Sequence, residues 1–169
     1  MAYNKDNVFA QILRGEMPSY PVFEDEKTYA FMDIMPASKG HTLVIPRSEA
    51  VNIFELEPDY IGAVAKTSKL VAEAIKEALS PSGVLITQLN EADAGQTVFH
   101  YHVHVIPVYS ESPMKIHTNK MENKDLLETT ANEIKKRNVK EIVIPSSKEC
   151  DLRKQENCQK IVEGVDRSE

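Results

Sequence analysis

The feature that most constrains the fold is a segment of about five helical turns, residues 61–79, whose apolar side chains lie on one side only. The apolar positions recur at steps of three and four residues, and lysine and glutamate side chains lie largely opposite them. This stripe consists of Ile61, Val64, Ser68, Val71, Ile75 and Leu79. A helix with one such stripe has to bury it against a flat apolar layer, so the segment predicts a layered domain.

Short strand-like runs on either side of the helix predict the second layer. They are rich in β-branched and aromatic residues, and they occupy residues 20–23, 28–32, 41–46, 83–89 and 98–107. The polar residues between the first two runs indicate a hairpin turn, which favours antiparallel pairing. We therefore predict an α+β fold, in which a mostly antiparallel sheet of about five strands has the long helix on one face.

Two shorter helices complete the predicted elements. Residues 8–13, followed by Gly15, predict a short N-terminal helix that ends at the glycine. Apolar residues spaced between 126 and 134 predict a C-terminal helix, for which Asp125 is the expected cap. Both helices are short enough to depend on packing against the sheet.

The domain is expected to end near residue 137. Residues 1–137 contain all the strongly patterned segments, whereas residues 138–169 are mostly polar and charged. We expect this extension to be largely flexible, with at most a short edge strand at residues 141–145. Cys150 and Cys158 fall within it, and their spacing matches no disulfide framework, so we expect two free thiols.

The charge balance limits the classes of partner. The chain of 169 residues carries 20 basic and 26 acidic side chains, for a formal net charge of -6. This balance argues against a surface built to hold a nucleic-acid backbone. Apolar runs fall far short of the roughly 18 to 20 residues that span a bilayer. The first residues lack the basic and apolar regions of a secretory signal, so we expect a cytoplasmic protein.

The strongest chemical signal is a set of three histidines at alternate positions within residues 98–105. Alternate side chains of a strand share a face, so His100, His102 and His104 are expected on one side, each roughly 6 to 7 Å from the next. Phe99 and Tyr101 are among the side chains expected on the other face, under the long helix. Core packing therefore explains one face of this strand and leaves the histidine face unexplained.

Three interpretations of the histidine face compete. The histidines could be partly exposed on a sheet that faces water, although the whole chain holds only 5 histidines. They could bind zinc, with His41 as a third ligand. Finally, a neutral imidazole can attack phosphorus with one nitrogen when its other nitrogen is held as a donor, and neighbouring histidines can donate to phosphate oxygens.

The histidine run resembles the signature of the histidine-triad family, in which three histidines alternate with apolar residues. Residues 100–106 fit this pattern at every position, and Tyr101 is the mildest fit. Further segments that resemble the family are residues 12–18, 31–34, 40–46 and 94–98. The resemblance covers roughly residues 7–137 and is closest to the Hint and bacterial Hit branch. It implies the HIT-like fold.

The resemblance implies a role for each of four histidines. His102 corresponds to the nucleophile, which takes a nucleoside monophosphate as a covalent nucleotidyl-histidine. His104 would contact the phosphate, and His100 would help to fix His102 through its backbone and ring. His41 would lie behind the triad in the same hydrogen-bond network. Water would then hydrolyse the intermediate, without a metal or other cofactor.

The resemblance also implies a purine nucleotide site. Asp33 corresponds to the carboxylate that binds the ribose hydroxyls, and the alternative is a plain turn residue before Pro36. Ile12 and Ile34 correspond to apolar walls around the purine, although they could equally be core residues. Gln96 and Thr97 lie where the family binds the phosphate or the leaving group.

The sequence departs from the family pattern at two places. Many relatives bind zinc through an N-terminal Cys-x-x-Cys pair and later histidines, whereas Asn7 and Ala10 occupy the cysteine positions here and Glu49 another ligand position. We therefore expect no structural zinc. In the loop before the triad, a family asparagine aligns with Leu89, or with Asn90 if the loop is one residue shorter. Asn90 is accordingly a candidate for contact with the ribose or phosphate.

Together these motifs imply a hydrolase that cleaves purine nucleotide derivatives at the α-phosphate. The Hint-like motifs favour adenosine 5′-phosphoramidates, with AMP as the product. The alternatives are a dinucleoside polyphosphate hydrolase, and a nucleotide-binding or scaffold protein with incidental turnover. The resemblance also implies a two-fold homodimer that pairs sheet edges or helices. His117 lies outside every matched segment and is expected at the surface.

Overall fold

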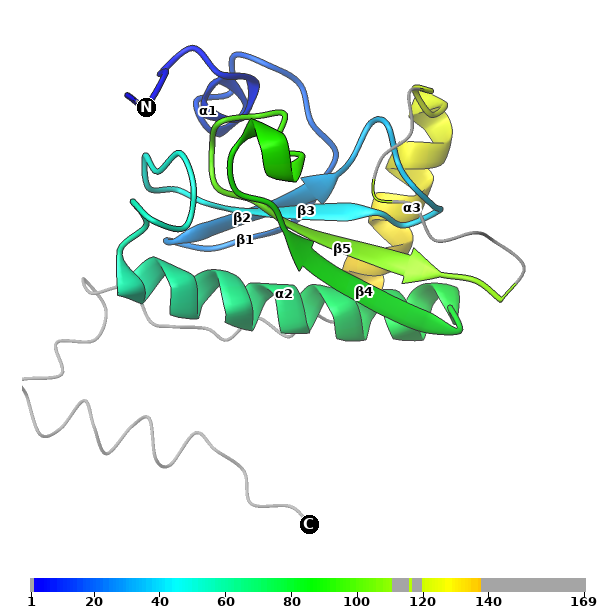
Figure 1. Cartoon of the computed structure of the whole chain (residues 1–169). Helices are drawn as coiled ribbons and strands as arrows, with labels where there is room; N and C mark the ends of the chain where they lie inside the picture. Colours follow the sequence, from blue (N-terminus) through cyan, green and yellow to red (C-terminus); the bar gives the residue numbers. More distant parts are fainter. Residues whose placement is uncertain (1, 111–115, 117–119, 138–169) are drawn as a thin grey trace, which may run out of the picture. The chain divides into compact units, whose positions relative to one another are not determined.

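The structure is a computed structural model that describes residues 2–110, 116 and 120–137 (Figure 1). The predicted surface position of His117, the edge strand at 141–145, the free thiols of Cys150 and Cys158, and the flexible extension 138–169 all lie outside the described residues. No helix in the described part of the chain has the length and apolar character needed to cross a membrane.

The elements follow the predicted order and build one antiparallel sheet. They are α1 (Val8–Leu13), β1 (Pro21–Glu24), β2 (Thr28–Met32), β3 (Thr42–Pro46), α2 (Pro58–Leu79), β4 (Gly83–Gln88), the 3₁₀ turn η1 (Ala92–Ala94), β5 (Val103–Val108) and α3 (Lys124–Lys136). The five strands are ordered β1-β2-β3-β5-β4, and every neighbouring pair is antiparallel. The predicted α+β fold is therefore confirmed.

The long helix α2 covers one face of the sheet, as its stripe predicts (Figure 1). Val64, Val71 and Ile75 are buried there in one core cluster that also contains Val44 and Val105 from the central strands. The helix begins with Pro58 in its first turn, where a missing N–H costs nothing. It ends at Ser80, which adopts the left-handed conformation that stops helices.

A smaller cluster lies on the opposite face of the sheet, under α1. It consists of Phe9 from the helix and Phe31, Leu43 and Ile45 from β2 and β3, all buried. Because alternate residues of a strand face opposite ways, β3 contributes Val44 to one cluster and its two neighbours to the other. All five residues of β3 are buried, as expected for a central strand covered on both faces.

The hairpin turn predicted between the first two strands is also present. The Asp25 carboxylate accepts hydrogen bonds from the backbone N–H of Lys27 and of Thr28, at 2.9 and 2.6 Å. An aspartate that bonds forward to its own backbone is a common way to close a turn. The turn joins β1 to β2 and so fixes their antiparallel pairing.

Two predicted details are wrong. The strand expected at 98–107 begins only at Val103, because the preceding backbone bonds elsewhere: the Tyr101 N–H donates to the Ala50 carbonyl at 2.8 Å. Tyr101 still packs under α2, whereas Phe99 is not part of that core. The cap of α3 is Asn123 rather than Asp125, because the Asn123 amide oxygen accepts from the first free N–H groups of the helix.

Candidate active site

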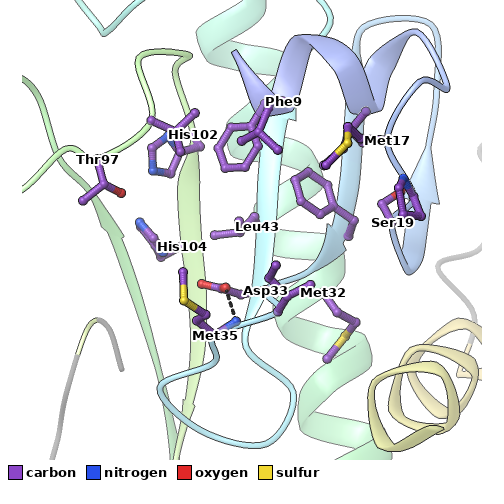
Figure 2. A pocket seen from close by; sticks show the side chains of 16 residues that line it. Phe9, Met17, Ser19, Met32, Asp33, Met35, Leu43, Thr97, His102 and His104 are labelled. Atoms are coloured by element: carbon purple, nitrogen blue, oxygen red, sulfur yellow. Dashed lines mark hydrogen bonds between the residues drawn. The ribbon is translucent and has the colours of Figure 1, made fainter. Parts of the chain in front are cut away.

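A pocket opens between α1, the end of β2 and the histidine segment (Figure 2). Helix α1 supplies one apolar wall, which includes Phe9 and Ile12, and the residues after β2 supply Asp33 and Ile34. Thr97, His102 and His104 complete the lining on the side of the loop and β5. Six of the predicted site residues thus line one cavity: Ile12, Asp33, Ile34, Thr97, His102 and His104.

His102 has the orientation that a nucleophilic imidazole needs. Its Nδ1 lies 2.7 Å from the backbone carbonyl of His100, and this carbonyl can only accept, so Nδ1 carries the proton. The lone pair of the neutral ring is therefore on Nε2. His102 is 2% exposed, and its ring packs edge-to-face with the ring of Phe9 at 5.2 Å between centroids. Backbone and packing together fix both the tautomer and the orientation.

His104 is oriented by a second hydrogen-bonded chain. The backbone N–H of Ala37 donates to Nδ1 of His41 at 3.1 Å, which leaves the proton of a neutral His41 on Nε2. That nitrogen lies 3.0 Å from Nδ1 of His104 and donates to it. The proton of His104 is consequently on Nε2, so His104 is a donor in a pocket where His102 offers a lone pair. His41 lies behind the triad, as the resemblance implies.

Asp33 lines the pocket directly after β2 (Figure 2). One carboxylate oxygen accepts the backbone N–H of Met35 at 2.8 Å, which holds the side chain in place. The other lies 3.4 Å from Nδ1 of His41. This contact is an ion pair only when His41 is protonated, and the N–H of Ala37 that points at the same nitrogen favours the neutral ring.

His100 is buried and held at both ring nitrogens. Its Nε2–H donates to the Pro46 carbonyl at 3.0 Å, and its Nδ1 lies 2.5 Å from the hydroxyl of Tyr3. Burial lowers the pKa of His100 to about 4, because a charged imidazole is poorly solvated there. His100 is therefore neutral near pH 7, and its carbonyl is the group that orients His102.

The histidines differ in two ways from the strand-based expectation. Only His104 lies within β5, and His100 and His102 precede it. The rings of His102 and His104 meet edge-to-face, with 4.9 Å between their centroids. All three side chains are buried, with exposures of 0%, 2% and 1%, so the interpretation of partly exposed histidines is wrong.

Asn90 and Gln96 do not line the pocket. The Asn90 amide pairs with the Gln88 amide and accepts the backbone N–H of Ile53 at 3.0 Å. Gln96 is buried and donates to the carbonyls of Val51 and Val98. Both amides therefore hold the loops beside the site together, in contrast to the predicted contacts with ribose, phosphate or leaving group.

Two residues near the triad were missed by the sequence analysis. Phe9 packs against His100 and His102, and Tyr3 bonds His100. Phe9 could have been found as an apolar position on the predicted N-terminal helix. Tyr3 is 97 positions from its partner in the chain, and no local pattern signals such a contact.

The positions that correspond to the relatives' zinc ligands do not fit a zinc ion here. The Asn7 side chain caps α1 by accepting from Phe9 and Ala10, and the carboxylate of Glu49 lies 3.4 Å from Lys5. Both nitrogens of His100 already have protein partners. A structural zinc would need ligand atoms that these side chains use for other contacts.

Within the described residues, Asp33, His41 and His104 also offer potential ligand atoms within 4.8 Å of one another. However, His41 and His104 direct nitrogens at each other across a hydrogen bond of 3.0 Å. One proton occupies the space between those atoms. The arrangement therefore matches a hydrogen-bonded relay, and the zinc interpretation of the triad with His41 gains no support from it.

Comparison with known proteins identifies the family. Residues 14–111 match the family model of the HIT domain. The chain is 43% identical to "Protein hit" of Bacillus subtilis over 108 residues, which cover 62% of this chain and 72% of the relative.

Solved structures agree with this match. A Hit-like protein from Bartonella henselae, described as involved in cell-cycle regulation, superimposes with a TM-score of 0.76 at 38% identity, over 82% of this chain and 100% of that one. A histidine triad nucleotide-binding protein from Sulfolobus tokodaii gives a TM-score of 0.71 at 34% identity, over 76% and 89%. The match over more than half of the sequence, a shared fold and a histidine triad of which His102 and His104 line the pocket together show that this chain belongs to the HIT domain family.

Proposed function

We propose that the protein is a hydrolase that cleaves purine nucleotide derivatives at the α-phosphate through a nucleotidyl intermediate on His102. The observation that carries this proposal is the hydrogen bond of 2.7 Å from Nδ1 of His102 to the His100 carbonyl, which places the proton on Nδ1 and the lone pair on Nε2, the nitrogen proposed to attack. The favoured substrates are adenosine 5′-phosphoramidates, which would release AMP and an amine.

The other pocket residues support complementary roles. The Nε2–H of His104 would donate to a nonbridging phosphate oxygen, where negative charge develops during attack. The carboxylate of Asp33 would bind the ribose hydroxyls, and Ile12 and Ile34 would enclose the purine. Thr97 would contact the phosphate or the leaving group. Asn90 and Gln96 are proposed to act on this site only through the loops that they hold.

The reaction would proceed in two displacements at phosphorus. In the first, Nε2 of His102 forms a bond to the α-phosphorus as the bond to the amine nitrogen breaks, and the amine leaves with a proton from water. In the second, the hydroxide left by that proton transfer bonds to phosphorus through its oxygen, the bond to Nε2 of His102 breaks, and AMP leaves. Neither step needs an oxidant, a reductant or a metal.

A substrate panel with purified protein would test this function. We expect steady-state release of AMP from an adenosine 5′-phosphoramidate, and a mass increase of one adenylyl group on His102 after rapid acid quench. Faster cleavage of diadenosine polyphosphates would instead identify a dinucleoside polyphosphate hydrolase. Tight nucleotide binding without an adduct or turnover would contradict the enzyme and favour the binding or scaffold protein.

We also propose that two copies assemble through α2 and β4. A groove between these elements is lined mainly by apolar side chains, among them Ile61, Ala72, Val84 and Ile86. Strand β4 is an edge strand of the sheet, and the relative exposure of its residue Ile86 is 49%. A second copy related by a two-fold axis could cover the groove on both molecules at once.

Light scattering at micromolar concentration is expected to give the mass of a dimer. Ile86→Glu would bring two carboxylates to the two-fold contact and should shift the mass to that of a monomer. Met121→Glu is the matched control, because Met121 is 65% exposed but lies outside the groove. A wild-type protein that is monomeric under these conditions would contradict the proposal.

A further inference from the structure

Tyr3 lies outside every motif that relates the chain to its family, yet its hydroxyl reaches the first histidine of the triad. The distance from the hydroxyl to Nδ1 of His100 is 2.5 Å, and the two rings meet edge-on with 5.6 Å between centroids. Since His100 uses its Nε2–H for the Pro46 carbonyl, its Nδ1 is the acceptor and the phenol donates. Burial raises the pKa of Tyr3, which keeps this phenol protonated as a donor.

The partner of Tyr3 is the residue on which His102 depends. The carbonyl of His100 fixes the tautomer of His102, and the His100 ring is fixed in turn by Pro46 on one side and Tyr3 on the other. A rotation or shift of His100 would move this carbonyl. The Tyr3 hydroxyl is therefore linked to the proposed nucleophile through a single residue, His100. Tyr3 itself does not line the pocket.

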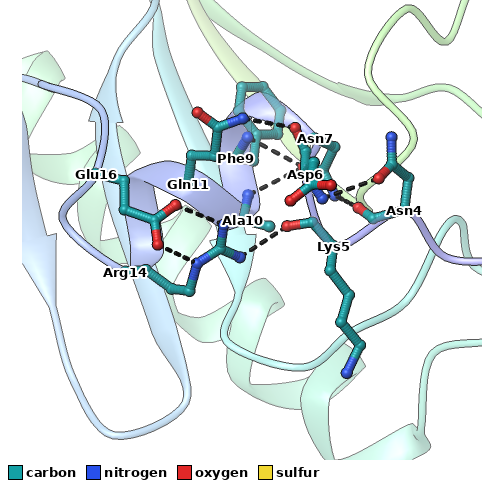
Figure 3. Close-up of polar contacts among 9 residues, drawn as sticks. All are labelled: Asn4, Lys5, Asp6, Asn7, Phe9, Ala10, Gln11, Arg14 and Glu16. Carbon is teal, nitrogen blue, oxygen red and sulfur yellow. Dashed lines mark hydrogen bonds and ion pairs between the residues drawn. The ribbon is translucent and has the colours of Figure 1, made fainter.

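The N-terminal segment, residues 4–7, which directly follows Tyr3, is held in place by contacts with α1 and the residues after it (Figure 3). Arg14 donates to the Lys5 carbonyl and Gln11 to the Asp6 carbonyl, each at 2.7 Å. The Asn7 amide donates to the carbonyl of Asn4 at 2.6 Å, while its oxygen caps α1. This segment is thus tied to the same helix that supplies Phe9 against the triad.

We propose that Tyr3 is a positioning residue for the reaction: its hydroxyl fixes the ring of His100, and through the His100 carbonyl it keeps His102 in the tautomer and orientation required for attack. The inference rests on the proposed function of His102. It assigns the N-terminal segment a part in catalysis, because the bonds of Asn7, Gln11 and Arg14 anchor residues 4–6 to α1 and so hold the adjacent Tyr3 near His100.

The direct test is Tyr3→Phe, which removes the hydroxyl and keeps the ring. We expect kcat for the phosphoramidate to fall by about three- to tenfold, the range that corresponds to one lost buried hydrogen bond. KM should change by less than about twofold, because Tyr3 is not among the residues that line the pocket. Tyr109→Phe is the matched control: it removes another tyrosine hydroxyl, which donates to the Lys39 carbonyl at 3.1 Å, and should keep wild-type kinetics.

A second measurement reports the contact without turnover. In ¹⁵N-labelled protein, the Nδ1 resonance of His100 should shift in Tyr3→Phe and stay unchanged in Tyr109→Phe. An unchanged Nδ1 resonance, a wild-type kcat in Tyr3→Phe, or a loss that falls on KM alone would overturn the inference. Failure of the proposed function is distinct, because it would appear in the wild-type protein as the absence of an adduct on His102.

Discussion

His102→Ala is expected to lower kcat for phosphoramidate cleavage by on the order of a thousandfold or more, because the variant has no group that can form the nucleotidyl intermediate. Nucleotide affinity should stay close to that of the wild type, since the proposed contacts of Asp33, Ile12 and Ile34 are separate from the nucleophile. Kinetics and equilibrium binding of AMP, measured on the same preparation, would check both parts of this expectation.

His104→Ala and His100→Ala serve as comparisons for that variant. His104 is proposed to stabilise charge rather than to bond with phosphorus, so its loss should be less severe. If His100→Ala proved far more damaging than His102→Ala, with both proteins folded, the assignment of the nucleophile within the triad would be wrong. Unfolding of His100→Ala would show as a lower urea midpoint and would be recognised before kinetics are compared.

Gly40→Ala should give the largest loss of stability among the single changes considered. Gly40 has a φ of +91°, a conformation that side chains with a Cβ rarely adopt, and it directly precedes His41. A Cβ there would collide with the Leu79 side chain at the end of α2 and approach Pro107 of β5 at 3.1 Å. Backbone strain and overpacking together correspond to roughly 2–4 kcal/mol of unfolding free energy.

Urea denaturation monitored by circular dichroism would measure this loss. Gly62→Ala is a control of opposite sign, because Gly62 lies inside α2 with no atom near its absent Cβ. That change should stabilise the protein by about 0.5–1 kcal/mol, the usual preference for alanine over glycine in a helix. Equal urea midpoints for Gly40→Ala and the wild type would show that the turn before His41 tolerates a side chain.

Patterns along the chain predicted the fold because its layers have simple periods. The stripe from Val64 to Ile75 marked the face of α2 that packs on the sheet, and this packing is observed. The start of β5 could not be predicted, because the alternation of apolar and polar side chains continues back through Tyr101. The backbone N–H of Tyr101 nevertheless bonds to the Ala50 carbonyl instead of a neighbouring strand. Periodicity reports which way a side chain points, but not which carbonyl the backbone meets.

The site was predictable in its residue types and less so in its contacts. Resemblance placed Asp33, His41 and the triad near one another, and the structure brings them to one side of the sheet. It also suggested that Asn90 faces the ligand. In the structure, the amides of Asn90 and Gln88 bond to each other. Tyr3 needed three-dimensional information, because it is close to His100 only after the chain has folded.

The apolar residues form a larger cluster under α2 and a smaller one under α1, so we expect local unfolding to cost less free energy on the α1 side of the sheet. Helix α1 has 6 residues, well below the ~12–15 at which isolated helices persist, and it rests on the smaller cluster. We therefore expect the wall formed by Phe9 and Ile12 to open from β3 more readily than α2 opens from its own face, as slower amide exchange in α2 than in α1 would show. A nucleotide bound between that wall and the sheet would contact both. Part of its binding free energy would then stabilise the packing of α1 against the sheet.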